Sequence, residues 1–372
     1  MTTKFEELLQ EKLRECVDQF NPPLVNGVPE WLWKGKKSLF LSLKSCKWRL
    51  KNSVEKSIIQ ILPWYRNHIV NKALAKIDLE AHAKTFDLLN DEFSQKAFIE
   101  VMALRLLGPR KVQMLHAQRS FYDSIEEIDS LKIENSPSIS YYWWNFNLFD
   151  LHKLGKDYRV YTTRNGVYMD WKSPQYEYFD KVHIQPGDYV IDGGACYGNT
   201  ALEFAYKAKE NGKVYSFEFL KENLDLCQKN FELNPELASR IEIIPHPLWS
   251  NSSLELYVIN NGPGTHVHSR QPMRYDSKVT SKSIDDLVSQ GIIEKIDFLK
   301  LDIEGAELEC LKGASEAIQH WKPQLAICVY HKDEDLIEIP QYLHQLVPEY
   351  KFYMKHHSAC SWETVLYATA DE

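Results

Sequence analysis

The stretch Val190-Ile191-Asp192-Gly193-Gly194-Ala195-Cys196-Tyr197-Gly198-Asn199-Thr200 decides the fold. An apolar run leads into it, and the helical pattern TALEFAYKAKE follows it. A glycine-rich turn between a strand and a helix lets a ligand approach the backbone near the positive end of the helix. The stretch therefore predicts a strand, a ligand-binding turn and a helix, in that order.

Short apolar runs alternate with helical patterns from residue 180 onward. The runs are DYVIDGG, KVYSFEF, IEIIPHP, IDFLKLD, QLAICVY, YKFYMKHH and ETVLYA. Strands separated by helices of ten or more residues predict an α/β fold with a parallel, doubly wound sheet. Upstream, Asn165-Gly166 lies between two strand-like runs, which predicts a β-hairpin with a type I′ turn over residues 159–171.

The N-terminal 140 residues have a different pattern and are predicted to be mainly helical. Thr3 and Glu6 match a capping box at the start of a first helix, and residues 91–107 form another amphipathic pattern. Between them, residues 31–75 hold ten lysines and arginines against the single acid Glu55, a local net charge of +9. We expect two domains, a helical one over 1–140 and an α/β one over 155–372.

The basic segment, residues 31–62, is predicted to form an amphipathic helix, with apolar residues three or four apart from Leu39 to Ile61. Two interpretations stay open. The helix lies on an anionic membrane surface, or its apolar stripe packs on the rest of the domain while the lysines face water.

Composition excludes several classes of protein. The chain has 372 residues, 44% hydrophobic and 26% charged, so it is neither collagenous nor mainly disordered. No apolar run approaches the roughly 20 residues that span a bilayer, and the N-terminus lacks a signal-peptide pattern. Seven scattered cysteines fit reduced thiols, and the net charge of −8 disfavours nucleic acid as a partner. We expect a cytoplasmic protein, and the oligomeric state stays open.

Two cofactor classes fit the glycine-rich turn. The following strand ends in Glu218, 24 residues beyond Gly194, where a carboxylate can accept both ribose hydroxyls of an adenine nucleoside. A nicotinamide dinucleotide requires a glycine where this chain has Ala195, and Asp192 would repel its pyrophosphate. S-adenosylmethionine carries a sulfonium and an ammonium but no phosphate, so the charge favours it. An NAD-dependent oxidoreductase remains the alternative.

Five motifs together resemble the FkbM-like family of S-adenosylmethionine-dependent methyltransferases. They are DGGACYGNT, SFEF with the asparagines that follow, IDFLKLDIEGAELECLKGA, AICVYHKDEDLIEIPQYL and YKFYMKHHSACSWETVLYA, and they span about residues 175–368. The resemblance implies a class I, Rossmann-like fold with a mostly parallel seven-stranded sheet. It also implies methyl transfer to oxygen, commonly a sugar hydroxyl of a glycan or glycosylated natural product.

The resemblance assigns roles to the cofactor side of the site. The methionine-binding loop would be formed by Asp192, Gly193, Gly194, Ala195 and Gly198. Glu218 would hold the ribose, and Phe219 would cover one face of the adenine. An acidic residue that often binds the adenine amine is absent from PHPLWS (residues 245–250), where Trp249 either stacks on the ring or belongs to the core.

The substrate side follows from a rule of open α/β sheets, in which ligands collect at the carboxyl ends of the strands. Asp302 and Glu304 follow one predicted strand and His331 follows the next. We expect His331 to be the general base, with Asp302 placed at the cofactor and positioning the acceptor. Glu304 either faces the site or caps the next helix. Asp302 with a histidine could instead hold a divalent metal ion.

The acceptor remains open at this point. A glycan or a small glycosylated molecule is the first interpretation, and a lipid or another small metabolite is the second. A non-catalytic cofactor-binding protein is the alternative from a different class.

Overall fold

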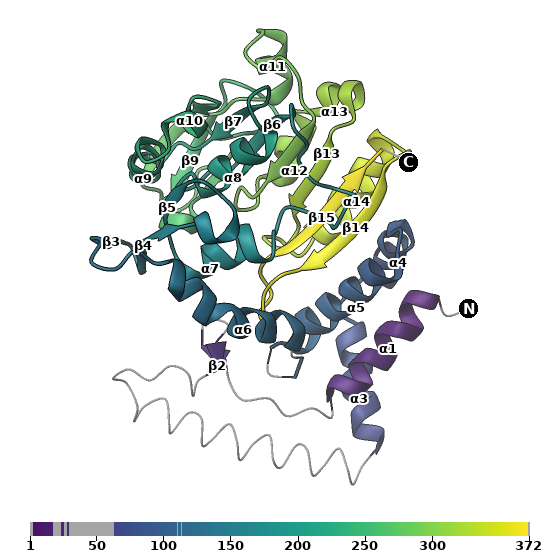
Figure 1. Ribbon diagram of the computed structural model, residues 1–372. Helices are drawn as coiled ribbons and strands as arrows, with labels where there is room; N and C mark the ends of the chain where they lie inside the picture. Colours follow the sequence, from purple (N-terminus) through teal and green to yellow (C-terminus); the bar gives the residue numbers. More distant parts are fainter. Residues whose placement is uncertain are drawn as a thin grey trace. The chain divides into compact units, whose positions relative to one another are not determined.

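The computed structural model describes residues 3–17, 24–25, 28–29, 63–109, 111–112 and 114–370 (Figure 1). These form two compact units, Met1–Ser120 with Met354–Thr364, and Phe121–Tyr353 with Val365–Glu372. Residues 121–140, which the sequence placed in the helical domain, thus belong to the second unit. The predicted basic helix over 31–62 lies outside the described residues. Among the described helices, none is both long and apolar enough to cross a bilayer.

The first unit is helical. Its elements are α1 (Lys4–Val17), β1 (Leu24–Val25), β2 (Val28–Pro29), α3 (Pro63–Leu74), α4 (Leu79–Leu88), α5 (Glu92–Leu107) and the start of α6 (Leu115–Leu131). The backbone N–H of Glu6 donates to the Thr3 hydroxyl at 3.2 Å, which is one half of the predicted capping box. Phe5, Phe86 and Phe98 are fully buried and pack with ring centroids 5.7–6.4 Å apart. The predicted helix over 91–107 is confirmed.

The second unit alternates strands and helices. Before the main sheet come β3 (Ile139–Tyr141), β4 (Trp144–Asp150), η2 (His152–Leu154), β5 (Arg159–Thr162), α7 (Arg164–Val167) and η3 (Tyr168–Lys172). The first half of the sheet adds β6 (Tyr189–Gly193), α8 (Asn199–Ala208), β7 (Lys213–Phe217), α9 (Lys221–Glu232), α10 (Pro235–Ala238) and β8 (Ile241–Ile244). An insertion follows with β9 (Glu255–Ile259), η4 (Gly262–Gly264), β10 (His266–His268) and β11 (Ser277–Thr280). The chain ends with α11 (Ile284–Ser289), β12 (Phe298–Leu301), α12 (Glu307–Lys312), α13 (Ser315–Trp321), β13 (Gln324–Cys328), α14 (Asp335–Leu346), β14 (Lys351–His356) and β15 (Thr364–Thr369).

The central sheet has seven strands in the order β14-β15-β13-β12-β6-β7-β8. Strands β13, β12, β6, β7 and β8 pair in parallel, whereas β15 runs antiparallel to β13. This is the mostly parallel, seven-stranded arrangement that the resemblance implied, and the predicted fold class is confirmed.

Both faces of this sheet are covered. Val190 and Phe298 pack in one hydrophobic cluster with residues of α8, and the alternate residues Ile191 and Leu299 are equally buried. A strand whose successive side chains are all buried must be sandwiched between two layers. The doubly wound architecture thus follows from the continuous apolar runs of the sequence.

The predicted hairpin over residues 159–171 is wrong. Strand β5 ends at Thr162, and Thr163 then caps helix α7 by accepting the backbone N–H of Gly166 at 3.0 Å. A Cβ at Gly166 would lie 2.2 Å from the Thr162 hydroxyl oxygen and 2.8 Å from that of Tyr197. Glycine is therefore required here by a close approach of side chains, and not by the positive φ angle of a type I′ turn.

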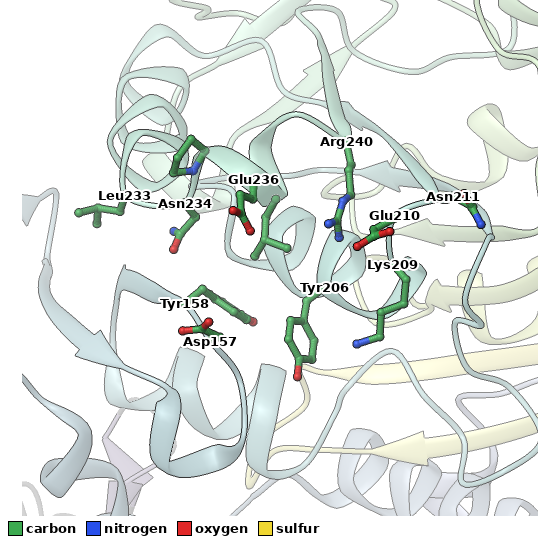
Figure 2. A pocket seen from close by; sticks show the side chains of 12 residues that line it. Asp157, Tyr158, Tyr206, Lys209, Glu210, Asn211, Leu233, Asn234, Glu236 and Arg240 are labelled. Atoms are coloured by element: carbon green, nitrogen blue, oxygen red, sulfur yellow. The ribbon is translucent and has the colours of Figure 1, made fainter.

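A pocket of about 720 Å³ opens at the amino ends of β7 and β8 (Figure 2). Its walls come from the end of α8, the turn before β7, α10 and the residues before β5. They are Asp157, Tyr158, Tyr206, Lys209, Glu210, Asn211, Leu233, Asn234, Pro235, Glu236, Leu237 and Arg240. Because cofactors of such folds bind at the carboxyl ends of the strands, this pocket lies at the opposite edge from the predicted site.

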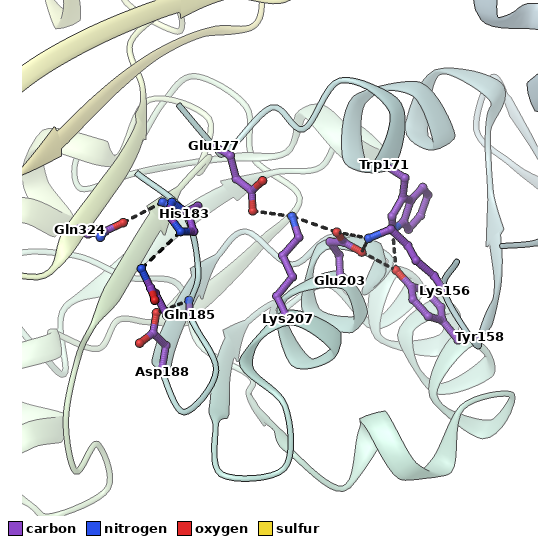
Figure 3. Close-up of polar contacts among 10 residues, drawn as sticks. All are labelled: Lys156, Tyr158, Trp171, Glu177, His183, Gln185, Asp188, Glu203, Lys207 and Gln324. Atoms are coloured by element: carbon purple, nitrogen blue, oxygen red, sulfur yellow. Dashed lines mark hydrogen bonds and ion pairs between the residues drawn. The ribbon is translucent and has the colours of Figure 1, made fainter. Parts of the chain in front are cut away.

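A buried ion-pair network ties the segment before the sheet to α8 (Figure 3). The almost fully buried carboxylate of Glu203 lies 2.8 Å from the Lys156 ammonium and 3.0 Å from that of Lys207, and it accepts the Tyr158 hydroxyl at 2.7 Å. Lys207 also pairs with Glu177. Buried charges are stable only when they are paired in this way. The network holds helix α8 in place, and the first turn of that helix follows the glycine-rich loop.

Candidate functional site

The glycine-rich loop runs from the end of β6 to the start of α8. The backbone N–H groups of Gly194 and Ala195 donate to the carbonyl of Phe217, at 3.1 and 3.0 Å. Gly194 has a φ of 83°, and a Cβ there would lie 2.0 Å from the carbonyl oxygen of Asp302. Only glycine allows this approach. The loop that the sequence assigned to the cofactor is thus in contact with the end of β12, where the predicted catalytic residues begin.

The charge of Asp192 is directed into the protein. Its side chain is fully buried, and its carboxylate receives the Lys300 ammonium at 3.0 Å and the Thr200 hydroxyl at 2.9 Å. Lys300 also donates to the carbonyls of Gly193 and Gly194, at 2.9 and 2.8 Å. Asp192 is therefore neutralised below the loop, and its charge does not select a cationic cofactor.

The sheet register explains this ion pair. Asp192 and Lys300 are partners across β6 and β12, so their side chains lie next to each other on one face. Burial alone would lower the pKa of Lys300, but the carboxylates of Asp192 and Asp302 outweigh it and raise the pKa above its usual value. Lys300 is therefore charged and acts as a fixed three-donor support for the loop.

Glu218 lies at the end of β7, as predicted for a ribose-binding carboxylate. One oxygen accepts the backbone N–H groups of Phe219 and Leu220, at 2.6 and 2.8 Å. The other accepts the Asn223 amide at 2.8 Å, and Asn223 in turn accepts the hydroxyl of Tyr141. These hydrogen bonds lower the pKa of Glu218, but burial outweighs them and raises it to about 7. The carboxylate is thus held in one orientation and is easily protonated, so a ribose hydroxyl that donated to it would stabilise its charged form.

The two predicted adenine contacts differ in setting. Phe219 is half-buried directly after Glu218. Trp249 is buried in a small cluster with Leu256 and Ala306, which is the packing role that the sequence left open beside stacking. Contact of either ring with adenine stays a prediction.

The predicted substrate-side residues converge. The side chains of Asp302, Glu304 and His331 each offer one ligand atom, and these three atoms lie within 4.8 Å of one another. The Nε2 atom of His331 is 3.4 Å from Asp302 Oδ1 and 3.5 Å from Glu304 Oε2. Glu304 therefore faces the cluster, and whether it also caps α12 stays open. Glu304 also has a φ of 55°, a conformation that costs a non-glycine residue energy.

His331 is surrounded by carboxylates. Its Nδ1 atom lies 2.9 Å from Oε1 of the fully buried Glu307. Burial would lower the pKa of His331, but Glu307, Asp302 and Glu304 outweigh it and raise the pKa to about 10. In this setting the imidazole is positively charged at neutral pH, with a proton on each ring nitrogen. A role as general base stays a prediction, and it requires that one of these protons leave first.

Three supporting residues were not assigned by the sequence argument. Tyr176 and Tyr330 donate to the two oxygens of Asp302, at 2.8 and 3.1 Å, and Glu307 orients His331. Glu307 is the first residue of α12, and its contact with His331 joins that helix to the end of β13. Tyr176 comes from the segment before β6, and nothing in its local pattern signals this contact.

The other histidines lie in different settings. His266 and His268 are half-exposed on β10, with ring centroids 5.1 Å apart. His356 is the last residue of β14 and His357 follows it, both in the first unit, and burial lowers the pKa of His356 to about 4. The Nδ1 atom of His356 lies 2.8 Å from the Thr364 hydroxyl, a contact between β14 and β15.

Comparisons with known proteins agree with this geometry. Residues 192–352 match the family described as "Methyltransferase FkbM domain". The chain is 28% identical over 176 residues to a protein named methyltransferase sdnD from Sordaria araneosa, a match that covers 39% of this chain and 66% of that relative.

A solved structure supports the fold. The methyltransferase FkbM from Methylobacillus flagellatus KT superposes with a TM-score of 0.51 at 20% identity, covering 81% of this chain and 60% of that one. The chain thus spans less than two thirds of the length of either relative. The matched residues begin at Asp192, include Glu218, Asp302, Glu304 and His331, and end in β14. Residues 192–352 are therefore similar to the FkbM methyltransferase domain, and this matched part of the chain contains both the glycine-rich loop and the residues at the ends of β12 and β13.

Proposed function

We propose that this protein transfers the methyl group of S-adenosylmethionine to a hydroxyl oxygen of a sugar, on a glycan or a glycosylated metabolite. The observation that carries the proposal is the contact between Gly194 and Asp302. It joins the loop expected to hold methionine to a cluster of two carboxylates and an imidazole. A polar cluster of this kind next to a methyl donor suits an acceptor that must lose a proton.

Each side of the site has a task under this proposal. Glu218 binds the ribose hydroxyls, and the loop from Gly193 to Gly198 encloses the methionine end. The acceptor oxygen attacks the methyl carbon, the carbon–sulfur bond breaks, and its electron pair stays on sulfur. The hydroxyl proton leaves to a base of the Asp302, Glu304 and His331 cluster. The protein contributes alignment and exclusion of water, which are large effects in reactions of this type.

A sugar acceptor is supported by the donor set, because carboxylates and an imidazole bind hydroxyl groups well. Methylation of a lipid or of another small metabolite uses the same site and is the second candidate. We propose no nucleic-acid partner, on the acidic net charge of the chain. The cytoplasmic location stays a prediction.

The experiment has two stages. Isothermal titration calorimetry of the full chain with S-adenosylmethionine, and separately with NAD, tests the cofactor, and Glu218→Ala is expected to lower affinity for the former at least tenfold. A cellular glycan fraction is then incubated with enzyme and labelled cofactor, and the expected product carries one additional methyl group on a sugar hydroxyl. Absence of S-adenosylmethionine binding refutes the proposal, whereas label found only in lipid or small-metabolite fractions refutes the sugar acceptor.

A further inference from the structure

We propose that Asp302, Glu304 and His331 form a binding site for one divalent cation, which also binds the acceptor hydroxyls; this second role rests on the proposed function. Two carboxylates and an imidazole are a ligand set that divalent first-row metals accept. Ligands at neighbouring positions of an octahedral cation lie about 3 Å apart, and those at opposite positions about 4 Å. The measured 3.4 and 3.5 Å between His331 Nε2 and the two carboxylates fit one shared ion after shifts of a few tenths of an ångström.

The histidine is the observation that separates this cluster from a merely acidic surface. The side chain of His331 is only 7% exposed, and its Nε2 atom points at Asp302 and Glu304 without a hydrogen-bond partner. A buried polar atom without a partner is costly, and such an atom needs an explanation. A bound cation would supply the missing partner for Nε2.

Residues around the cluster orient its members, as the residues around metal ligands usually do. A metal-binding histidine usually directs its other ring nitrogen at a carboxylate, which fixes the ring. Here Nδ1 of His331 lies 2.9 Å from the buried Glu307, whose same oxygen accepts the backbone N–H of Ile303 at 2.8 Å. Asp302 is held by the Tyr176 hydroxyl on the oxygen that does not face His331. Glu307 thus orients His331, and Tyr176 orients Asp302.

The charge balance favours a cation. Asp302, Glu304 and Glu307 provide three carboxylates around one imidazole. Lys300 is engaged by Asp192 and two carbonyls through all three of its donors. Lys332 lies near the cluster, because a Cβ at Gly305 would be 3.1 Å from its Cε, but one lysine does not balance three carboxylates. A divalent cation would neutralise the excess negative charge. By coordinating an acceptor hydroxyl, it would also make that hydroxyl easier to deprotonate.

The test uses Mn²⁺ alone with the full chain, measured by calorimetry and by the electron paramagnetic resonance signal of free Mn²⁺. We expect one saturable site. His331→Ala and Glu304→Gln should each weaken binding at least tenfold, and Glu307→Gln should weaken it by about 10- to 100-fold, the usual range for an outer-shell partner. Glu304 is partly exposed, so its substitution leaves folding intact.

His152→Ala is the matched control. His152 also pairs with two carboxylates, Asp150 and Asp157, but through opposite ring nitrogens on the surface, so it cannot bring them to one ion. This variant should bind Mn²⁺ like the wild type. No saturable binding at millimolar Mn²⁺, or unchanged binding in His331→Ala and Glu304→Gln, overturns the proposal. Because no cofactor or acceptor is present, failure here is distinct from failure to bind S-adenosylmethionine.

Discussion

Replacing Lys300 by methionine tests whether the buried ion pair supports the glycine-rich loop. Methionine keeps most of the length of the side chain but removes the charge and the three hydrogen bonds to Asp192, Gly193 and Gly194. Lys300 is 1% exposed and Asp192 is fully buried, so Asp192 would be left as an uncompensated buried charge. Breaking a buried pair in this way costs about 3–5 kcal/mol of unfolding free energy.

The assay is urea denaturation of the full chain, combined with hydrogen exchange of peptides from β6 and β12. A loss of 3–5 kcal/mol at an m-value of about 3 kcal/mol per molar lowers the urea midpoint by roughly 1 M or more. The double variant Asp192→Asn with Lys300→Met should lose much less than the sum of the two single variants, because it leaves no unpaired charge. Lys312→Met, at a half-exposed surface pair with Glu309, should change stability by less than about 1 kcal/mol.

Two results would contradict this reasoning. One is a Lys300→Met variant that unfolds at the same urea concentration as the wild type. The other is strict additivity in the double variant, which would mean that the two side chains do not stabilise each other.

Three further predictions concern the loop, a buried acid and the basic segment. Gly194→Ala should weaken S-adenosylmethionine binding at least tenfold by calorimetry, because its Cβ meets the Asp302 carbonyl; an unchanged affinity would show that the loop adapts freely. Burial raises the pKa of Asp170 to about 7, so the folded state binds a proton that the unfolded chain loses above about pH 4, and stability falls as pH rises from 4 to 7. Asp170→Asn should flatten that decline and raise stability at pH 8 by about 2–4 kcal/mol in urea denaturation, and a stability at pH 8 equal to that of the wild type would contradict it. Deleting residues 31–62 should abolish binding to anionic liposomes in a sedimentation assay while sparing cofactor affinity, and retained liposome binding would assign the lysines to a solvated surface.

The order of the elements could be predicted because continuous apolar runs, glycine-rich turns and helical periods are local signals. The strand, turn and helix around Gly194 were found for this reason, and so was the convergence of Asp302 with His331. The predicted hairpin was wrong because Thr163 caps a helix instead. Gly166 is needed because a side chain there would collide with its neighbours, and not because of its backbone angle. Sequence spacing alone does not distinguish these two uses of glycine.

Partners across the sheet were harder to predict than positions along the chain. The carboxyl-end rule places Asp192 near the cofactor, but only the register of β6 against β12 shows that Lys300 lies next to it. The sequence therefore could not show that the charge of Asp192 is neutralised by Lys300 and not by a ligand. In the same way, the effect of Glu307 on His331 depends on a contact between α12 and the end of β13.

Strand β12 explains how the cofactor side and the acceptor side of the site are connected. Phe298, Lys300 and Asp302 alternate onto one face, so this face changes from apolar core to buried cation to partly exposed carboxylate within five residues. His331 and then Lys300 lower the pKa of Asp302 against the effect of burial, and Lys300 is itself stabilised by Asp192, so one buried charge acts on both the glycine-rich loop and the acceptor cluster. Loss of this cation should therefore disturb both sides together, by releasing the loop carbonyls and by raising the pKa of Asp302. By contrast, a substitution at Glu304 or His331 should weaken Mn²⁺ binding and leave the loop intact, because neither side chain contacts Lys300 in the described hydrogen bonds.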